Sequence, residues 1–371
     1  MIKRLSRLGR AGCVSRKQRI LVLLALCAFA GIAVAGSAAD TAGSSPVPVS
    51  FAHLCPAPPP GELTCFALHK TSGVVASIPP GVSPAATVGG YGPADLASAY
   101  KLPTSQGSGK TVAIVDAYND PNAESDLATY RSQFGLPACT TANGCFKKVN
   151  QNGATSPLPA NNTGWAGEIA LDIEMVSAAC PNCHILLVEA SSPTIANLGT
   201  AVNTAVSQGA IAVSNSYGGS ESSGDPTSSA TYYQHAGVAI TVSSGDGGYG
   251  VEFPASSPYV TSVGGTSLSR ASNARGWTET VWGSASNANG GAGSGCSAFE
   301  SKPTFQHDTG CSRRTVADVS AVADPNTGVA VYDSFGSGGW TVFGGTSVAS
   351  PVVASVYALA AAPTAGTFPN S

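Results

Sequence analysis

The stretch 164–175, GWAGEIALDIEM, carries three carboxylates, Glu168, Asp172 and Glu174, within an apolar run that predicts a helix. A charged side chain on a helix that faces a protein core is costly unless it is paired or takes part in chemistry. Glu168 and Asp172 are four residues apart, so a helix places them on one face. One carboxylate could then act as a base while the other hydrogen-bonds to it and orients it. Glu174 falls on another face, where we expect a solvated or salt-bridged residue.

The stretch 339–351, GWTVFGGTSVASP, supplies a candidate nucleophile for such a base. An apolar strand runs through two glycines to Ser347 and continues into a helical run. Ser347 would lie at a helix N-terminus, where the dipole and the free N–H groups favour negative charge that develops nearby. Pro351 would fit the first helical turn, where the N–H that it lacks is not needed. Taken alone, a serine at this position could equally be a plain helix cap.

Three further segments follow predicted strands, at 115–121, 214–221 and 243–250. Working residues of a parallel sheet collect beyond the carboxyl ends of its strands. From the second segment we expect Ser216, Tyr217 and Gly218 to bind substrate. Asp246, in the third, lies in the Gly-rich context SGDGG, which is also good turn chemistry. For Asp116, in the first, we expect a structural or substrate-side role.

The elements that must position these residues can be identified from residue 89 onwards. Short apolar strands are predicted at 110–118, 184–190, 210–216 and 238–245, and they alternate with helices at 123–135, 194–209 and 228–237. This alternation is typical of βαβ units that form a mainly parallel sheet covered by helices on both faces. The sequence therefore predicts an α/β fold.

Taken together, these motifs resemble those of the sedolisin family, the serine-carboxyl peptidases, which share the subtilisin-like fold. GGTSVASP resembles the nucleophile motif of the superfamily, and 317–328, ADVSAVADPNTG, resembles the segment before it. A subtilisin needs a catalytic histidine in an HGT context, and none of the five histidines has one. Over about 91–362 the sequence instead has three motifs in the order of the sedolisin family, E-x-x-x-D, S-G-D-x-G and G-T-S-x-x-x-P. The resemblance implies a subtilisin-like three-layer fold, with Glu168 as the base, Asp172 as its partner, Asp246 as the oxyanion donor and Ser347 as the nucleophile.

The resemblance implies a serine-type endopeptidase that hydrolyses polypeptides through an acyl-enzyme. An oxyanion donor such as Asp246 must be protonated, and a free aspartic acid has a pKa of about 3.9, so we expect an acidic working pH. The alternative is an inactive exported binding or structural module on the same fold. A metal-dependent hydrolase is a third possibility, but a cluster of histidine ligands is missing and Ser347 would have no role. We expect a monomer.

The N-terminus predicts export. Seven Lys and Arg residues precede the apolar run 20–36 and the small residues 37–39, which is the order of a secretory signal peptide at 1–39. If it is not cleaved, this run of 17 residues could serve as a membrane anchor, because spans need about 17–25 residues. Without the signal, 11 basic and 21 acidic residues remain, so we expect no nucleic-acid partner.

The eight cysteines after the signal fall in neighbouring pairs. We expect four disulfides in an exported protein, at 55–65, 139–145, 180–183 and 296–311. The CPNC stretch at 180–183 could also indicate a zinc or redox site, although a second CxxC or a histidine at ligand spacing is missing.

Composition divides the rest of the chain in two. Residues 40–88 are rich in Pro and Ala and predict a linker or a short pro-segment without a core, and 89–371 form the predicted peptidase domain. Sedolisins carry a calcium site well after the serine. The residues after Ser347 include no Asp or Glu, so we expect the calcium region to be missing and assign no metal or cofactor.

Overall fold

A computed structural model describes residues 50–72, 88–283, 290–363 and 366–368. The predicted signal at 1–39 lies outside these residues. In the described part of the chain, no helix is both long and apolar enough to span a membrane.

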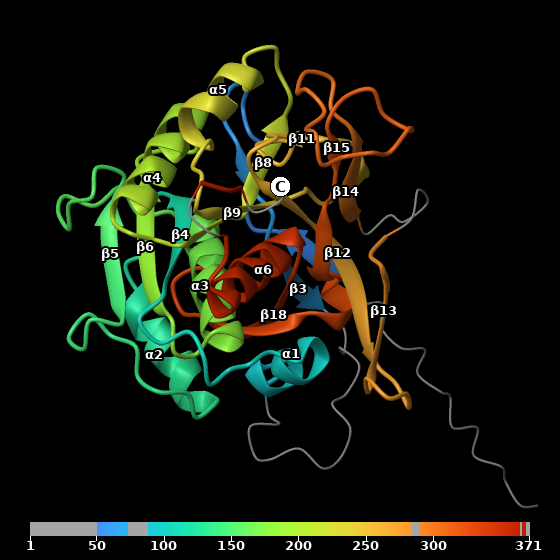
Figure 1. Ribbon diagram of the computed structural model, residues 1–371. Coiled ribbons are helices and arrows are strands. Elements are labelled where there is room, and N and C mark those ends of the chain that lie inside the picture. Colours follow the sequence, from blue (N-terminus) through green and yellow to red (C-terminus); the bar gives the residue numbers. More distant parts are fainter. Residues whose placement is uncertain (1–49, 73–87, 284–289, 364–365, 369–371) are drawn as a thin grey trace, which may run out of the picture. The chain divides into compact units, whose positions relative to one another are not determined.

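The centre of the molecule is a mainly parallel sheet with the strand order β13-β12-β9-β7-β4-β6-β5, in which β16 also pairs with β12 (Figure 1). Only β13 runs antiparallel to its neighbour among these described strands. Their bounds are β4 Thr111–Ala117, β5 Phe146–Asn150, β6 His184–Ala190, β7 Ala212–Asn215, β9 Ala239–Ser243, β12 Thr261–Arg270, β13 Trp277–Val281 and β16 Val319–Val322. The four strands predicted from the sequence are confirmed as β4, β6, β7 and β9.

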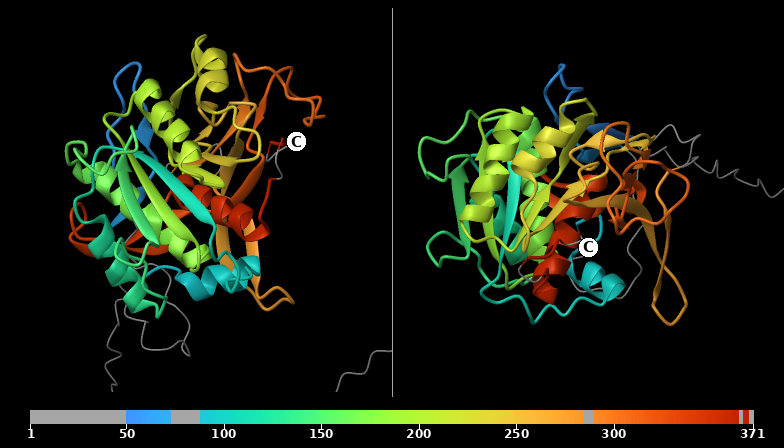
Figure 2. Two further views of the ribbon diagram at one scale, coloured as in Figure 1. Left: turned by 60° about the vertical axis from the view of Figure 1, so that its left-hand side comes forward. Right: turned by 45° about the horizontal axis from the view of Figure 1, so that its top comes forward.

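Helices cover both faces of this sheet, as the two views of Figure 2 show. They are α1 Pro93–Tyr100, α2 Ala123–Gln133, α3 Thr163–Ala179, α4 Ile195–Ser207, α5 Asp225–Tyr232 and α6 Thr346–Ala360. Successive residues of β4 point to opposite faces. Ile114 packs in a core cluster with residues of α2, α3 and α6, whereas Ala113 packs in a cluster with residues of α4. The predicted α/β architecture is therefore confirmed.

Three small sheets lie outside the central one. Their orders are β1-β3-β18-β17, β11-β8-β2 and β10-β14-β15. Their strands are β1 Ser50–His53, β2 Thr64–Cys65, β3 Leu68–Ser72, β8 Tyr217–Ser220, β10 Gly247–Tyr249, β11 Glu252–Phe253, β14 Gly291–Cys296, β15 Thr315–Val316, β17 Val329–Asp333 and β18 Gly339–Gly344, and a short 3-10 turn, η2, covers Pro325–Thr327.

The first two small sheets include residues 50–72, part of the stretch 40–88 that we expected to be a linker or a short pro-segment without a core. The expected lack of a core was wrong for 50–72, because Leu63, Phe66 and Leu68 are buried and the strands pair with β8 and β18. The Pro-rich stretch lies between the two cysteines of a disulfide, so its composition describes a loop and not the strands beside it.

Helix α3 is buried along almost its whole length, from Trp165 to Ala179. The Asn162 side chain caps its start by accepting the N–H groups of Gly164 and Trp165 at 3.0 and 3.1 Å. Helices α1, α2 and α6 and strands β4 and β17 pack around α3, so its residues from Trp165 onwards are shielded from water. Glu174 is consequently 0% exposed and accepts the N–H of Tyr332 at 3.0 Å. The expectation of a solvated or salt-bridged Glu174 was wrong.

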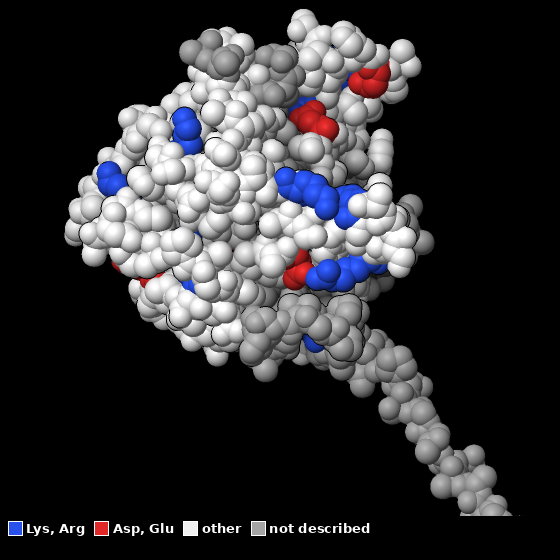
Figure 3. All heavy atoms as spheres, turned by 60° about the horizontal axis from the view of Figure 1, so that its bottom comes forward, with Lys and Arg blue, Asp and Glu red and all other residues white. Residues whose placement is uncertain are grey.

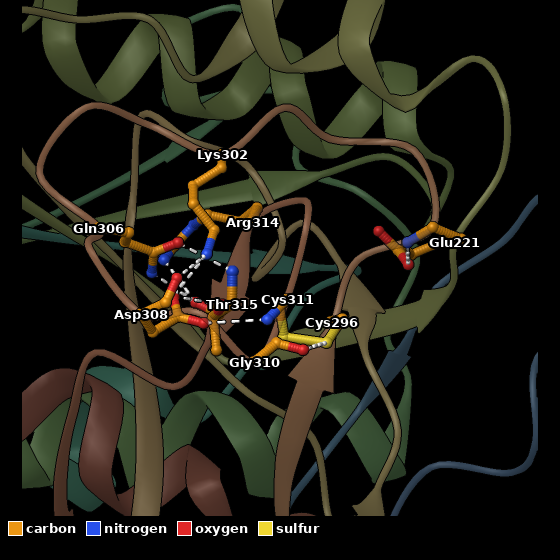
Figure 4. Close-up of a disulfide and its surroundings, with 10 residues drawn as sticks. Glu221, Cys296, Lys302, Gln306, Asp308, Gly310, Cys311, Arg314 and Thr315 are labelled. Carbon is orange, nitrogen blue, oxygen red and sulfur yellow. Dashed lines mark hydrogen bonds and ion pairs between the residues drawn. A yellow bond between two sulfur atoms is a disulfide. The ribbon is translucent and has the colours of Figure 1, made fainter.

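All four expected disulfides are present, at Cys55–Cys65, Cys139–Cys145, Cys180–Cys183 and Cys296–Cys311. Figure 4 shows the last of them at the base of a loop. Within this loop Asp308 accepts Lys302 Nζ at 2.8 Å and the N–H of Cys311 at 3.1 Å. The hydrogen bond from Lys302 is the main reason why the pKa of Asp308 falls to about 2. Polar contacts and a covalent bond together fix this surface loop.

Candidate active site

Ser347 is the second residue of α6 and is 0% exposed. The chain enters the helix through Gly345 at φ 97°, a conformation that glycine adopts without strain. A Cβ at Gly345 would also collide with the carbonyl oxygen of Phe66. Pro351 is the sixth residue of α6, so its predicted place in the first turn was wrong. Because it lacks an N–H, Pro351 leaves the Ser347 carbonyl without its helical partner, and Ser216 Oγ lies 3.5 Å from that oxygen.

Glu168 and Asp172 project from α3, as predicted, and both are completely buried. Glu168 Oε2 accepts the N–H of Ala67 at 2.8 Å, and Oε1 has no hydrogen-bond partner among the described residues. Ser347 Oγ donates to the Ser216 carbonyl at 3.5 Å, and the nearby Ser347 hydroxyl lowers the pKa of Glu168. Asp172 Oδ1 accepts Ser216 Oγ at 2.9 Å. The expected direct hydrogen bond between Glu168 and Asp172 is not found among the described contacts. The two carboxylates interact through their charges instead.

Asp116, the sixth residue of β4, belongs to the same cluster. It is 0% exposed, and neither of its carboxylate oxygens has a hydrogen-bond partner within the described structure. Burial raises the pKa of Glu168 and of Asp172 well above their usual values, and the charge of Asp116 is the next cause for both. Since three adjacent buried carboxylates cannot all be ionised, the cluster shares its protons. The sequence did not predict that Asp116 lies beside Glu168 and Asp172, because its position near a strand end does not indicate which side chains it meets in the fold.

Asp246 follows β9 and is held by one of its two oxygens. Oδ1 accepts both the N–H and the Oγ1 of Thr346 at 2.8 Å. Oδ2 has no hydrogen-bond partner among the described residues. A Cβ built on Gly345 would lie 2.8 Å from Oδ2 and would collide with the carbonyl oxygen of Phe66, so these two oxygens lie near each other. Burial, aided by the charge of Glu252, raises the pKa of Asp246 to about 7, against the effect of the hydrogen bonds from Thr346. A protonated Oδ2 could therefore donate to a carbonyl oxygen at this position.

Residues 62–68, here called the cleft segment, run through the site in an extended conformation. On one side Thr64 pairs with Gly218 and Cys65 with Tyr217, antiparallel, as a peptide adds to a sheet edge. The N–H of Phe66 donates to the Ser216 carbonyl at 3.4 Å. Ser216, Tyr217 and Gly218, predicted to bind substrate, thus contact the chain's own peptide.

On the other side of the site, Leu68 of the cleft segment pairs with Gly344 of β18, three residues before the serine. The peptide bond between Phe66 and Ala67 therefore lies within the cluster. Its carbonyl oxygen lies near Asp246 Oδ2, and its nitrogen donates to Glu168. The carbonyl end of this peptide bond therefore lies near Asp246, and its amide end is hydrogen-bonded to Glu168.

The sheet order, the helices on both faces and the serine at the start of α6 define a subtilisin-like protein. Residues 107–367 match the subtilase family. Kumamolisin from Bacillus sp. (strain MN-32) is 34% identical over 296 residues, which cover 72% of this chain and 51% of that protein. Sedolisin from Pseudomonas sp. (strain 101) is 30% identical over 308 residues, which cover 74% and 51%. The chain thus spans about half the length of these curated relatives.

A solved structure of Pseudomonas sedolisin, described as a serine-carboxyl proteinase complexed with two molecules of pseudo-iodotyrostatin, is also similar. It matches with a TM-score of 0.63 and 28% identity over 76% of this chain and 84% of that one. The chain belongs to the subtilase family and, within it, to the sedolisins.

Proposed function

We propose that the protein is an exported serine-carboxyl endopeptidase. The observation that carries this proposal is the position of the Phe66–Ala67 peptide bond. Its oxygen lies near Asp246, and its nitrogen donates to Glu168, the carboxylate whose pKa the Ser347 hydroxyl lowers. A peptide held in this way is oriented for attack, and such positioning supplies much of the acceleration in acyl transfer. The relatives named as sedolisin and kumamolisin support the same reaction class.

In the proposed reaction, Ser347 Oγ attacks the carbonyl carbon of a substrate and its proton passes to Glu168. Asp246, protonated on Oδ2, donates to the oxygen that becomes negative. Glu168 then gives its proton to the leaving nitrogen, the C–N bond breaks and an acyl-enzyme forms. Water activated at Glu168 hydrolyses the ester and restores Ser347. Asp172 and Asp116 act through the shared protons of the cluster, and the steps require no metal or cofactor.

The proposed acidic working pH is based on the protonation states that the reaction requires of two carboxyl groups. Glu168 must be ionised to accept the proton, whereas Asp246 must be protonated to donate. Burial raises the pKa of Asp246 to about 7, so its protonated form prevails below that pH. Burial also raises the pKa of Glu168, so the acid limb moves toward the alkaline limb. The optimum should therefore be a narrow bell just below neutral pH, with apparent pKa values that belong to the coupled cluster.

Export is supported by the signal-like N-terminus and by the four disulfides. We propose that the chain up to Phe66 is a pro-segment that must leave the cleft before another polypeptide enters. The active form would be a monomer, because one chain supplies every residue of the site. Figure 3 shows Lys and Arg only in small separate groups on the face drawn, which does not favour a nucleic acid as partner.

The deciding experiment uses the variants Ser347→Ala and Glu168→Gln with denatured casein at pH 2–8, with and without calcium. Each variant should abolish hydrolysis, and the double variant should lose no more than either single one, because the two residues act as a unit. Ser355→Ala and Glu174→Gln are matched controls on the same two helices and should stay active. Full activity of Ser347→Ala contradicts the proposal. If the wild-type protein binds casein but does not cleave it, the alternative of an inactive binding module is supported.

A further inference from the structure

The pocket that receives the Phe66 side chain contains an acid that the proposed reaction does not use. Phe66 is 3% exposed and lies against Gly218. A Cβ on Gly218 would come within 2.7 Å of Phe66 Cζ and 3.0 Å of Glu252 Oε2. The carboxylate of Glu252 therefore lies close to the tip of the ring, in the pocket for the residue before the cleaved bond.

The pocket extends beyond the ring. A cavity of about 620 Å³ is lined by Phe66 and Glu252, by residues of β10 and the two that follow it, and by residues near the Cys55–Cys65 disulfide. A phenyl ring leaves this volume open, so a longer side chain has room to follow the same path.

Glu252 is held in this pocket without a counter-charge. The described residues donate no hydrogen bond and form no ion pair to its carboxylate, and burial raises its pKa to about 7. The other titratable groups of the lining are Asp246, an acid, and His53, whose pKa burial lowers. Glu252 is half-buried, so water solvates its carboxylate only in part, and a cation at this position would supply the counter-charge that the carboxylate lacks.

We propose that Glu252 sets the preference of this pocket, which takes a lysine or arginine side chain in preference to an aromatic ring. The apolar stem of such a residue would follow the path of the Phe66 ring, and its head would reach Glu252. The substrates would be polypeptides cleaved after basic residues. This inference rests on the proposed function, because it takes the cleft segment as a guide to the path of a substrate.

The first test measures binding without hydrolysis. In the full chain carrying Ser347→Ala, we would combine Phe66→Arg with Glu252→Gln in a double-mutant cycle and follow denaturant unfolding at pH 8. The two substitutions should be coupled by at least tenfold in the unfolding constant, about 1.4 kcal/mol. Phe66→Met, long but neutral, is the control and should show less than threefold coupling with Glu252→Gln. Equal coupling in both cycles, or a Phe66→Arg chain that fails to fold where Phe66→Met folds, overturns the proposal.

The second test measures cleavage. Peptides that differ only in Arg or Phe before the cleaved bond are compared by kcat/KM, and Glu252→Gln should lower the Arg to Phe ratio at least tenfold. Glu124→Gln on α2, outside the cavity lining, is the matched control. If Glu252→Gln is active but its Arg to Phe ratio equals that of wild type, Glu252 does not set the preference of the pocket. If wild type cleaves neither peptide, the proposed function is contradicted, and the double-mutant cycle of the first test still decides the role of Glu252.

Discussion

The proposed oxyanion role of Asp246 makes a quantitative prediction. Its Oδ1 is occupied by two hydrogen bonds from Thr346, so the proton needed for donation belongs on Oδ2, near the carbonyl of Phe66. Asp246→Ala removes this donor and should lower kcat by about 10²–10³, the range for deletion of one oxyanion donor, which is about 2.7–4 kcal/mol. Asp246→Ala also leaves the buried N–H and Oγ1 of Thr346 without their acceptor, so this variant should lose stability as well, whereas Asp246→Asn keeps an oxygen that can accept both.

The pH dependence separates this role from a purely structural one. Burial raises the pKa of Asp246 to about 7, so the protonated fraction falls as pH rises through that value. Above it, wild-type kcat should fall by about tenfold per pH unit if one deprotonation stops the reaction. Asp246→Asn donates through its amide at any pH, so it should keep partial activity and flatten the alkaline limb.

The assay is kcat against pH, from pH 3 to 9, on one peptide for wild type and for the Asn and Ala variants. Asp225→Asn is a suitable control, because Asp225 is also buried but accepts hydrogen bonds from Ser222 at the start of α5. An Ala variant as active as wild type would reduce Asp246 to a turn residue. An alkaline limb that persists unchanged in the Asn variant would assign that limb to another group, and an optimum above neutral pH would refute the carboxylate mechanism.

Three further predictions concern the whole chain. Active wild type should acquire a new N-terminus at Ala67, whereas Ser347→Ala stays intact; N-terminal sequencing that finds the same new end in both would point to another protease. Burial raises the pKa of Asp120 to about 7 and of Glu189 to about 8, so the folded state holds protons that the unfolded state has lost. Stability should therefore be fullest below about pH 4 and fall as pH rises to about 8, as denaturant titration of Ser347→Ala would show, and a rise over that range would contradict the assignment. Non-reducing peptide mapping should recover the four local disulfides, and long-range links or free thiols would refute the pairing.

The residues of the site differ in how far the sequence could predict them. The strands and α3 were predictable because their patterns are local. The position of Ser347 at the start of a helix was predictable because two glycines precede it and a helical run follows, whereas its role as nucleophile came from the resemblance to the sedolisin family. The burial of Glu174 was not predictable, because it depends on elements that pack around α3 from distant parts of the chain. The cleft segment was hidden for the same reason, since Thr64 meets Gly218 only in the folded chain. Glu252 has no local signal, because its place is set by the approach of β11 to β8.

The cleft segment also affects how binding to this protein should be measured. In the uncleaved chain an added ligand competes with a tethered peptide, so its apparent affinity falls in proportion to the fraction of molecules whose cleft is open. If one molecule in about a hundred is open, an inhibitor will seem about a hundredfold weaker than it is. The Cys55–Cys65 disulfide restricts the segment on one side of the Phe66–Ala67 bond. Its reduction should loosen the segment, and the same inhibitor should then titrate at lower concentration although none of its own contacts has changed.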